Sequence, residues 1–226
     1  MTIAAVIPSY NNEETVGRVV RETMPYVAQV FVIDDGSTDE TAHAARAAGA
    51  RVVRVQRNRG KGHALRVGFR CALKEGFEAV VTLDADGQHD PAEIPRFIER
   101  YRRTKALMVV GNRMEGRLDM PRVRYGPNLI GTYTFSWLIG RPVPDSQCGF
   151  RLYDRMVMER LRILNNGFEA EADLLLRAGK RGYAIEFVPV KSIYFQGPGS
   201  LSHFRAVRDT FRICIIFLMN LFWKNR

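Results

Sequence analysis

The sequence predicts an α/β fold with a doubly wound, mostly parallel sheet and helices on both faces. Short apolar runs rich in β-branched residues recur along the chain, as expected for strands that are covered on both faces. They lie at 3–7, 30–33, 52–55, 79–83 and 107–110. Stretches with helical character separate these runs, which is typical of a parallel sheet with crossover helices. Ligands of such sheets bind beyond the carboxyl ends of the strands, so functional residues are expected there.

Four helices are predicted in this half, and each begins at a residue type that caps helices or favours the first turn. They run from Asn11 or Asn12 to Val19, from the segment 37–40 to Ala48, from Gly60 to Leu73, and from Asp90 to Tyr101. Beyond Gly111 the alternation of apolar runs and helical stretches ends. The sequence there predicts a basic loop over 113–124, helices over 128–139 and 168–179, and a last strand over 183–190.

Composition, charge and cysteine content indicate which class of protein to expect. The 226 residues are 46% hydrophobic, which is enough for one folded domain, and the net charge of +10 favours anionic partners. A charge that serves solubility alone is the alternative. Three cysteines without a C-x-x-C pair indicate neither a disulfide framework nor a zinc site, and the N-terminus lacks the pattern of a secretory signal. We therefore expect a cytoplasmic protein.

The C-terminal segment predicts a separate amphipathic helix over 203–226, after a main domain over 1–202. Its apolar run, 213–223, is too short to cross a bilayer, which needs about 20 residues. Basic residues flank this run on both sides, which favours a helix that lies in the membrane interface. A helix that packs on the sheet or on another subunit is an equal alternative.

Two carboxylates mark the end of one predicted strand. Asp84 and Asp86 are two residues apart, so on a strand their side chains can point the same way. Two converging carboxylates repel each other unless a cation joins them, and Mg²⁺ or Mn²⁺ prefers such oxygen ligands together with phosphate oxygens. The sequence thus predicts a divalent metal site here. A carboxylate pair that only caps the helix at Pro91 is the alternative.

Two further strand ends carry polar residues. Asp34 and Asp35 follow the second apolar run, where carboxylates can accept hydrogen bonds from a base and a ribose. Tyr10 follows the first run and can lie against a base. Each segment alone is also an ordinary turn former.

Together these segments resemble the family 2 inverting glycosyltransferases with the GT-A fold, in particular the branch that makes dolichyl- or polyprenyl-phosphate sugars. The resemblance extends from Ile3 to His203. Its markers are Pro8-x-Tyr10-Asn11, Asp34-Asp35-Gly36-Ser37-x-Asp39, Asn58-x-Gly60-Lys61-Gly62, Asp84-Ala85-Asp86-x-Gln88-x-x-Pro91, Gly111-Asn112-Arg113 and Asp145-x-Gln147-Cys148-Gly149-Phe150-Arg151. As an ordered set they are specific.

The resemblance implies roles for individual residues. Nucleotide-sugar contacts are expected from Pro8, Tyr10, Asn12, Ile33, Asp35, Asp84, Ala85, Asp86, Arg113, His203 and Arg205. The lipid phosphate is expected at Arg113, Arg124 and Asn128, and the metal at Asp86, Gln88 and Asp84. Asp86, Arg113 and Arg124 are the residues expected to act in catalysis. Asn128 stands where the family has Ser, Asn12 where many members have Glu, and the 194–203 region lacks the Arg and Lys of some members.

The acceptor decides whether a base is needed. A lipid monophosphate, with a second pKa of about 6, is already ionised at neutral pH, whereas a sugar hydroxyl needs a general base. Glu169, Glu171 and Asp173 are candidates for that base, although we favour a structural or loop-positioning role for them. The arginines of the basic loop, Arg117 and Arg122 among them, favour a phosphate acceptor because the guanidinium fork donates two parallel hydrogen bonds.

The resulting hypothesis is a hexosyltransferase, peripheral at the cytoplasmic face of the membrane. It would use a GDP-mannose- or UDP-glucose-type donor, a polyprenyl or dolichyl phosphate acceptor, and Mg²⁺ or Mn²⁺, with inversion and without nucleic acid. One alternative is a family 2 enzyme that acts on a sugar hydroxyl in polysaccharide or glycolipid synthesis; another is a non-catalytic module that binds anionic ligands or membranes. The base, the hexose, the lipid and the quaternary state, a homo-oligomer included, stay open.

Overall fold

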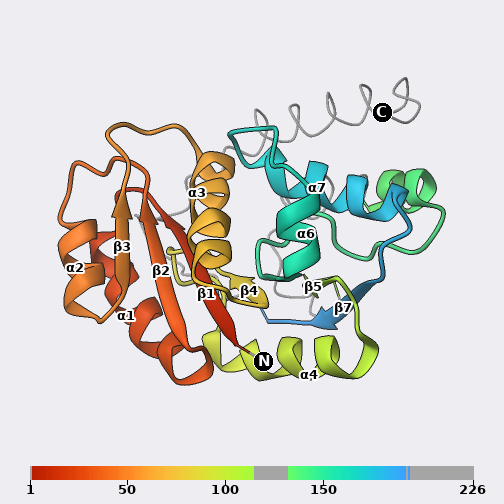
Figure 1. The fold of residues 1–226 in the computed structure, drawn as a ribbon, viewed down its shortest axis with the longest axis horizontal. Helices are drawn as coiled ribbons and strands as arrows, with labels where there is room; N and C mark the ends of the chain where they lie inside the picture. Colours follow the sequence, from red (N-terminus) through yellow and green to blue (C-terminus); the bar gives the residue numbers. More distant parts are fainter. Residues whose placement is uncertain (1, 115–131, 192, 194–226) are drawn as a thin grey trace.

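A seven-stranded sheet forms the centre of the protein, with the strand order β3-β2-β1-β4-β6-β5-β7 (Figure 1). The computed structural model describes residues 2–114, 132–191 and 193. The strands are β1 (Ile3–Ser9), β2 (Gln29–Asp34), β3 (Arg51–Arg54), β4 (Ala79–Thr82), β5 (Met108–Asn112), β6 (Arg151–Asp154) and β7 (Ile185–Pro189). All pairings are parallel except those of β6, which is antiparallel to both β4 and β5. The predicted mostly parallel α/β sheet is confirmed.

Helices cover both faces of this sheet. They are α1 (Glu13–Thr23), α2 (Thr41–Ala47), α3 (Lys61–Lys74), α4 (Ile94–Thr104), α6 (Arg155–Arg160) and α7 (Glu169–Lys180), with short 3-10 turns η1 (Met24–Tyr26) and η2 (Pro91–Glu93). Residues 132–139 are also helical. Figure 1 shows α3 and α6 on one side of the sheet and α1 and α4 on the other. Helix α3 packs against β1 and β2, and α4 packs against β5, β6 and β7.

The central strands are buried because helices lie on both of their faces. Every residue of β1 and of β4 is buried, which explains their continuous apolar sequences. Phe97 of α4 stacks on Phe150 with ring centroids 4.3 Å apart. This contact is part of the core between α4 and the strands β5, β6 and β7. Among the described residues, no helix is long and apolar enough to cross a membrane. The predicted tail helix over 203–226 lies outside the described residues.

The helix expected to be capped within the segment 37–40 begins at Thr41 with Glu40 at its N-cap, as predicted, and Ser37 lies in the preceding turn, where its N–H donates to Asp34 Oδ1 (2.8 Å). The helix expected from Asp90 is divided into η2 and α4. Asp90 caps the first piece by accepting from Ala92 N (2.9 Å).

Strand β6 and helix α6 were not predicted. Their insertion places β6 between β4 and β5, so that the chain leaves β5 and returns in β6 beside it. Gly111 N donates to Phe150 O (2.9 Å) where the two strands meet. The segment 113–150 is therefore a long excursion whose two ends are neighbours.

Candidate active site

The carboxyl ends of β1, β2 and β4 meet at one edge of the sheet. Strand β1 pairs in parallel with β2 and β4, and Pro8 lies opposite Ile33 in the register. Asp84 follows the end of β4. The predicted nucleoside and diphosphate residues are thus brought to one edge, as the strand pattern implied.

Asp35, just after β2, holds the loop before α3 in place through hydrogen bonds. Its Oδ2 accepts from the backbone N–H groups of Arg59 (2.9 Å) and Gly60 (2.5 Å), and its Oδ1 lies 3.6 Å from His63 Nδ1. Burial raises the pKa of the Asp35 carboxyl, although the two backbone hydrogen bonds oppose this shift, and burial lowers the pKa of His63. Gly60 adopts φ +99°, a conformation that favours glycine at this turn.

Asn12 organises the turn after β1. Its Oδ1 accepts from Tyr10 N (3.2 Å) and Ser9 Oγ (3.3 Å), and its backbone N–H donates to Thr41 Oγ1 (2.7 Å). Asn12 is buried, and Tyr10 is half-buried at the same turn. Pro8, Ile33 and Ala85 are buried as well.

A buried ammonium joins two carboxylates at the centre of the site. Lys61 Nζ, from the first turn of α3, lies 2.5 Å from Asp84 Oδ1 and 2.8 Å from Glu171 Oε2. Burial disfavours the charged lysine, but the two adjacent carboxylates outweigh that cost and hold the pKa of Lys61 above its usual range. Burial likewise opposes ionisation of Asp84, yet Lys61 keeps the pKa of this carboxyl below its usual value. Lys61 and Asp84 therefore stay charged at neutral pH.

Two glycines allow this cluster to form. A Cβ at Gly149 would lie 2.7 Å from Lys61 Nζ and 2.9 Å from Asp84 Oδ2. A Cβ at Gly62 would lie 2.3 Å from Asn165 O, where the loop before α7 presses on α3. Gly149 thus leaves room for the charged side chains, and Gly62 leaves room for the backbone that precedes α7.

The loop after β4 carries the predicted metal ligands. Asp86 Oδ1 accepts from Gln88 N (3.0 Å), and Ala85 O accepts from Thr15 Oγ1 (2.6 Å). The carbonyl of Gln88 accepts from Ile193 N (3.0 Å), so the chain beyond β7 contacts this loop. Asp86 and Gln88 are both half-buried at the edge of the sheet.

The chemistry of these side chains fits a divalent cation. Within the described parts of the chain, no group of three or more His, Cys, Asp or Glu residues is placed to hold a metal alone. Mg²⁺, however, usually takes one or two carboxylates and completes its shell with substrate phosphates and water. The Asp86 carboxylate and the Gln88 amide offer such oxygen ligands, whereas Asp84 Oδ1 is already in contact with Lys61.

His89 lies behind this loop as a neutral, buried side chain. Its Nδ1 accepts from Asp84 N (3.3 Å), and its ring lies 5.3 Å from that of Phe150. Burial lowers the pKa of His89 to about 4. The acceptor nitrogen that orients the Asp84 backbone is thus preserved at neutral pH.

Arg113 and Asp145 form an ion pair beside the site, with two hydrogen bonds between the guanidinium and the carboxylate. Arg113 Nε donates to Asp145 Oδ2 (2.7 Å), and its second guanidinium nitrogen donates to Oδ1 (3.0 Å). Asp145 is fully buried and also accepts from the N–H groups of Gln147 (2.9 Å) and Cys148 (3.0 Å). Burial opposes ionisation of Asp145, but Arg113 holds the pKa of this carboxyl low.

Arg151 is a positioning residue whose role was not predicted. Its buried guanidinium donates to three carbonyls: Cys148 O (2.6 Å), Ser146 O (2.9 Å) and Glu171 O (2.6 Å). It therefore ties the 146–148 loop to the start of α7. A charged residue in the marker Gly149-Phe150-Arg151 was the available signal, but a pattern does not reveal its partners.

The acidic residues of α7 are not a solvated surface. Glu171 is 5% exposed and Asp173 is 4% exposed, and Asp173 is paired with Arg177 (2.7 Å). Each of these two carboxylates is buried beside a cation, Lys61 for Glu171 and Arg177 for Asp173. Several predicted residues lie outside the described residues: Arg117, Arg122, Arg124, Asn128, His203 and Arg205.

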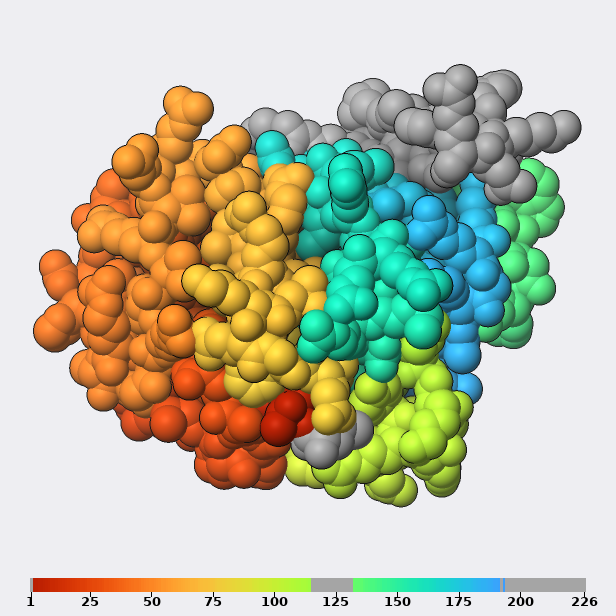
Figure 2. Space-filling model, viewed as in Figure 1, coloured from red at the N-terminus to blue at the C-terminus, as the bar shows by residue number. Residues whose placement is uncertain are grey.

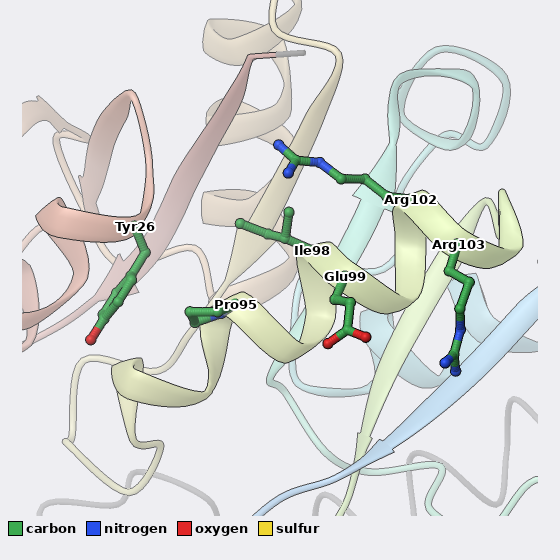
Figure 3. Close-up of a pocket in the computed structure, with 6 residues that line it drawn as sticks. All are labelled: Tyr26, Pro95, Ile98, Glu99, Arg102 and Arg103. Carbon is green, nitrogen blue, oxygen red and sulfur yellow. The ribbon is translucent and has the colours of Figure 1, made fainter.

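A surface hollow of about 600 Å³ lies elsewhere, on the outer side of α4 (Figure 3). Its walls are Tyr26, Pro95, Ile98, Glu99, Arg102 and Arg103. Tyr26 is the last residue of η1, in the connection that leads into the amino end of β2. It is not part of the site at the carboxyl ends.

Comparison with known proteins places the chain among sugar transferases. Residues 4–162 match the family described as glycosyl transferase family 2. The undecaprenyl-phosphate mannosyltransferase of Micrococcus luteus is 29% identical over 84% of this chain and 83% of its own length. A dolichyl-phosphate hexose transferase of Haloferax volcanii is 32% identical over 83% and 81%. The polyprenol monophosphomannose synthase of Mycolicibacterium smegmatis is 31% identical over 82% and 75%.

Solved structures agree on the fold. The glucosyl-3-phosphoglycerate synthase of Mycobacterium tuberculosis, in complex with phosphoglyceric acid, has a TM-score of 0.79 at 23% identity, over 99% of this chain and 81% of its own. The same enzyme has been crystallised with Mn²⁺, uridine diphosphate and glucosyl-3-phosphoglycerate, and this structure has a TM-score of 0.76 at 22% identity over the same shares.

Proposed function

Because this chain belongs to glycosyl transferase family 2 and is a glycosyltransferase, we propose that it moves a hexose from a nucleotide-sugar to polyprenyl or dolichyl phosphate, with inversion. The names of its relatives support this acceptor, since they include transferases to undecaprenyl, dolichyl and polyprenyl phosphate. The reaction would take place at the cytoplasmic face of the membrane, where the lipid phosphate is reached by a peripheral enzyme.

The ion pair between Lys61 and Glu171 is the observation that carries the choice of acceptor. A sugar hydroxyl needs a base to take its proton, and Glu171 is a buried carboxylate within the Asp84 cluster. Lys61 Nζ lies 2.8 Å from Glu171 Oε2, so this carboxylate is engaged in an ion pair within the cluster rather than free to face a hydroxyl acceptor. A phosphate with a second pKa of about 6 attacks as a dianion and needs no base.

The donor would lie along the edge formed by β1, β2 and β4. Pro8, Tyr10, Asn12, Ile33 and Asp35 would hold the nucleoside, with Asp35 acting mainly by fixing the loop at Gly60. Asp84, Ala85 and Arg113 would meet the sugar diphosphate, and His203 and Arg205 would add to this grip. Arg113, Arg124 and Asn128 would receive the lipid phosphate. Arginine suits this role because it donates paired hydrogen bonds to phosphate.

A divalent cation would be held by Asp86 and Gln88, with Asp84 beside them. When bound, Mg²⁺ or Mn²⁺ supplies a Lewis acid that neutralises the charge that grows on the leaving diphosphate. The fold neighbour crystallised with Mn²⁺ or Mg²⁺ and uridine diphosphate is consistent with this cofactor. In this proposal Lys61 keeps Asp84 oriented, and Arg113 stabilises phosphate charge.

The test combines a donor screen with one variant. Purified protein with Mn²⁺ is assayed with GDP- and UDP-hexoses and a short-chain polyprenyl phosphate; transfer from one of them is expected. Glu171→Gln keeps the shape of the side chain and one oxygen that can accept from Lys61, while Asp84 remains the counter-ion of this ammonium; the change removes the basicity of Glu171, and we expect most of the turnover to remain. Near-complete loss of turnover with intact donor binding would instead favour a hydroxyl acceptor. Asp173→Asn serves as the matched variant on the same helix.

A further inference from the structure

Two aromatic side chains form an exposed face on the helix of residues 132–139. Tyr133 is 70% exposed and Trp137 is 69% exposed. They are four residues apart and therefore lie on the same side of the helix, one turn above the other. In Figure 1 this helix (green) lies at the end of the molecule opposite α2, and Figure 2 shows it on the outer surface. We call Tyr133 and Trp137 the aromatic face.

The opposite side of this helix is anchored to the protein. Phe135 is 1% exposed, and a Cβ at Gly179 of α7 would lie 2.6 Å from Ile139 Cγ2. Ser136 Oγ accepts from Val143 N (2.9 Å), and Thr132 Oγ1 donates to Pro144 O (2.9 Å). The aromatic face is consequently presented outward from a helix that is fixed on its other side.

The chemistry of this face fits the interface of a lipid bilayer. Tyr and Trp combine an apolar ring with a polar tip, and both are enriched at the level of lipid headgroups. Lys180 and Arg181, which follow Gly179, are exposed at the end of α7, on the anchored side of the helix. The net charge of +10 suits an anionic membrane surface.

The position of the helix in the sequence supports the same partner. It comes shortly after Arg113, Arg124 and Asn128 in the sequence, the residues expected to receive the lipid phosphate. We propose that Tyr133 and Trp137 form a membrane-docking face that inserts into the headgroup region of an anionic bilayer. The inference rests on the proposed function for its biological purpose, because a lipid-linked acceptor reaches the enzyme from the bilayer.

Tryptophan fluorescence tests the contact directly. Trp137 and Trp223 are the two tryptophans of the chain, so Trp223→Phe leaves Trp137 as the sole reporter. This variant is titrated with phosphatidylcholine–phosphatidylglycerol vesicles that contain brominated acyl chains. A blue shift and quenching of Trp137 are expected. Vesicle-bound protein whose Trp137 emission is neither shifted nor quenched would overturn the proposal, and so would a failure to bind the vesicles.

A second measurement uses the full chain with Tyr133→Ala and Trp137→Ala together. The partition coefficient of the protein onto vesicles is expected to fall about tenfold or more. At about 25 cal/mol per Å², the loss of about 60 Å² of apolar surface buried in the bilayer is enough for that change. Met24→Ala removes an exposed apolar side chain (44% exposed) at η1, far from the aromatic face in sequence, and should leave partition unchanged. Equal partition of the double variant and the wild type would overturn the proposal. A stable dimer that the double variant dissolves would do so as well.

The two proposals can fail separately. Transfer to a short-chain, water-soluble polyprenyl phosphate needs no bilayer, so the double variant should keep wild-type turnover in that assay while its vesicle binding falls. Wild-type protein that docks through Trp137 but transfers no hexose would refute the proposed function and leave the docking face standing. Normal transfer by a protein whose Trp137 does not meet lipid would refute the docking face alone.

Discussion

Lys61 Nζ lies 2.8 Å from Glu171 Oε2, so an ammonium in the first turn of α3 is bonded to a carboxylate in the first turn of α7. The same ammonium contacts Asp84 at the end of β4. One side chain thus connects the helix after β3, the strand end that meets the diphosphate in our proposal, and the helix before β7. The site depends on this buried charge cluster for its shape.

Removal of Lys61 should destabilise the fold, and a second substitution at Glu171 should restore part of the lost stability. Lys61→Met leaves Glu171 buried and unpaired beside Asp84, and we expect the free energy of unfolding to fall by about 3–5 kcal/mol. The double variant Lys61→Met/Glu171→Met removes both members of the buried pair and should recover at least half of that loss, because Asp84 is 29% exposed and can be solvated. Denaturant unfolding of the four proteins in the cycle measures this. Additive losses would contradict the pairing.

Gly149→Ala should damage the site more than the fold. Its Cβ would lie 2.7 Å from Lys61 Nζ, and the lysine is clamped between two carboxylates. We expect hexose transfer to fall at least about tenfold, with a loss of about 1–3 kcal/mol in unfolding free energy from overpacking. Gly17→Ala is the matched control, since its Cβ would meet ordinary contacts of 3.4 Å in α1. Full activity of Gly149→Ala would show that the cluster has room to shift.

Asp86→Ala and chelation of metal should both abolish transfer. The proposal assigns Asp86 to the cation that neutralises the departing diphosphate, so we expect a loss of about 100-fold or more in turnover. EDTA should do the same to the wild type, and added Mn²⁺ should restore it. Asp90→Ala, four residues away, removes only the cap of η2 and should keep its activity. Full turnover of Asp86→Ala, or indifference of the wild type to EDTA, would refute the metal site.

His89 should make the fold sensitive to mild acid. Its pKa is about 4 in the folded protein, against an ordinary value of 6.5, so the unfolded chain binds the proton more readily. Its stabilising contribution is complete above pH 6.5 and disappears as the pH falls towards 4, with a total of roughly 3 kcal/mol. Urea unfolding across this pH range measures the effect.

His89→Asn is the control for that experiment. The amide oxygen can replace Nδ1 as the acceptor for Asp84 N but does not titrate. Other groups, such as the Asp84 and Asp35 carboxyls, titrate in both proteins and cancel in the comparison. The wild type should therefore lose more stability than the variant between pH 6.5 and 4. Parallel curves would contradict the role of His89.

The donor half of the fold could be predicted because its signals are local. The buried strands that end at Ser9, Asp34 and Thr82 have continuous apolar sequences, and Gly60 and Asn12 stand where helices begin. Parallel pairing then brings their carboxyl ends together without further information. The candidate residues Asp35, Asp84 and Asp86 followed from that position in the sheet.

The missed elements depend on contacts between distant residues. Strand β6 begins with Arg151, which is buried only because the carbonyls of Ser146, Cys148 and Glu171 surround its guanidinium. No periodicity of apolar residues in the sequence predicts such a strand. Lys61 likewise stood in a predicted marker, but its two carboxylates come from different parts of the chain. Sequence patterns gave the positions of these charges and not their pairing.

The antiparallel insertion of β6 has a consequence for how such enzymes diversify. Because the chain departs after Asn112 and re-enters at Arg151 beside its point of departure, an insertion in the connection between them would leave the pairing of β5 with β6 in place. Lengthening such a connection adds only a logarithmic penalty in closure entropy. The acceptor side of such an enzyme can therefore change in length while the ion pair between Arg113 and Asp145 is kept.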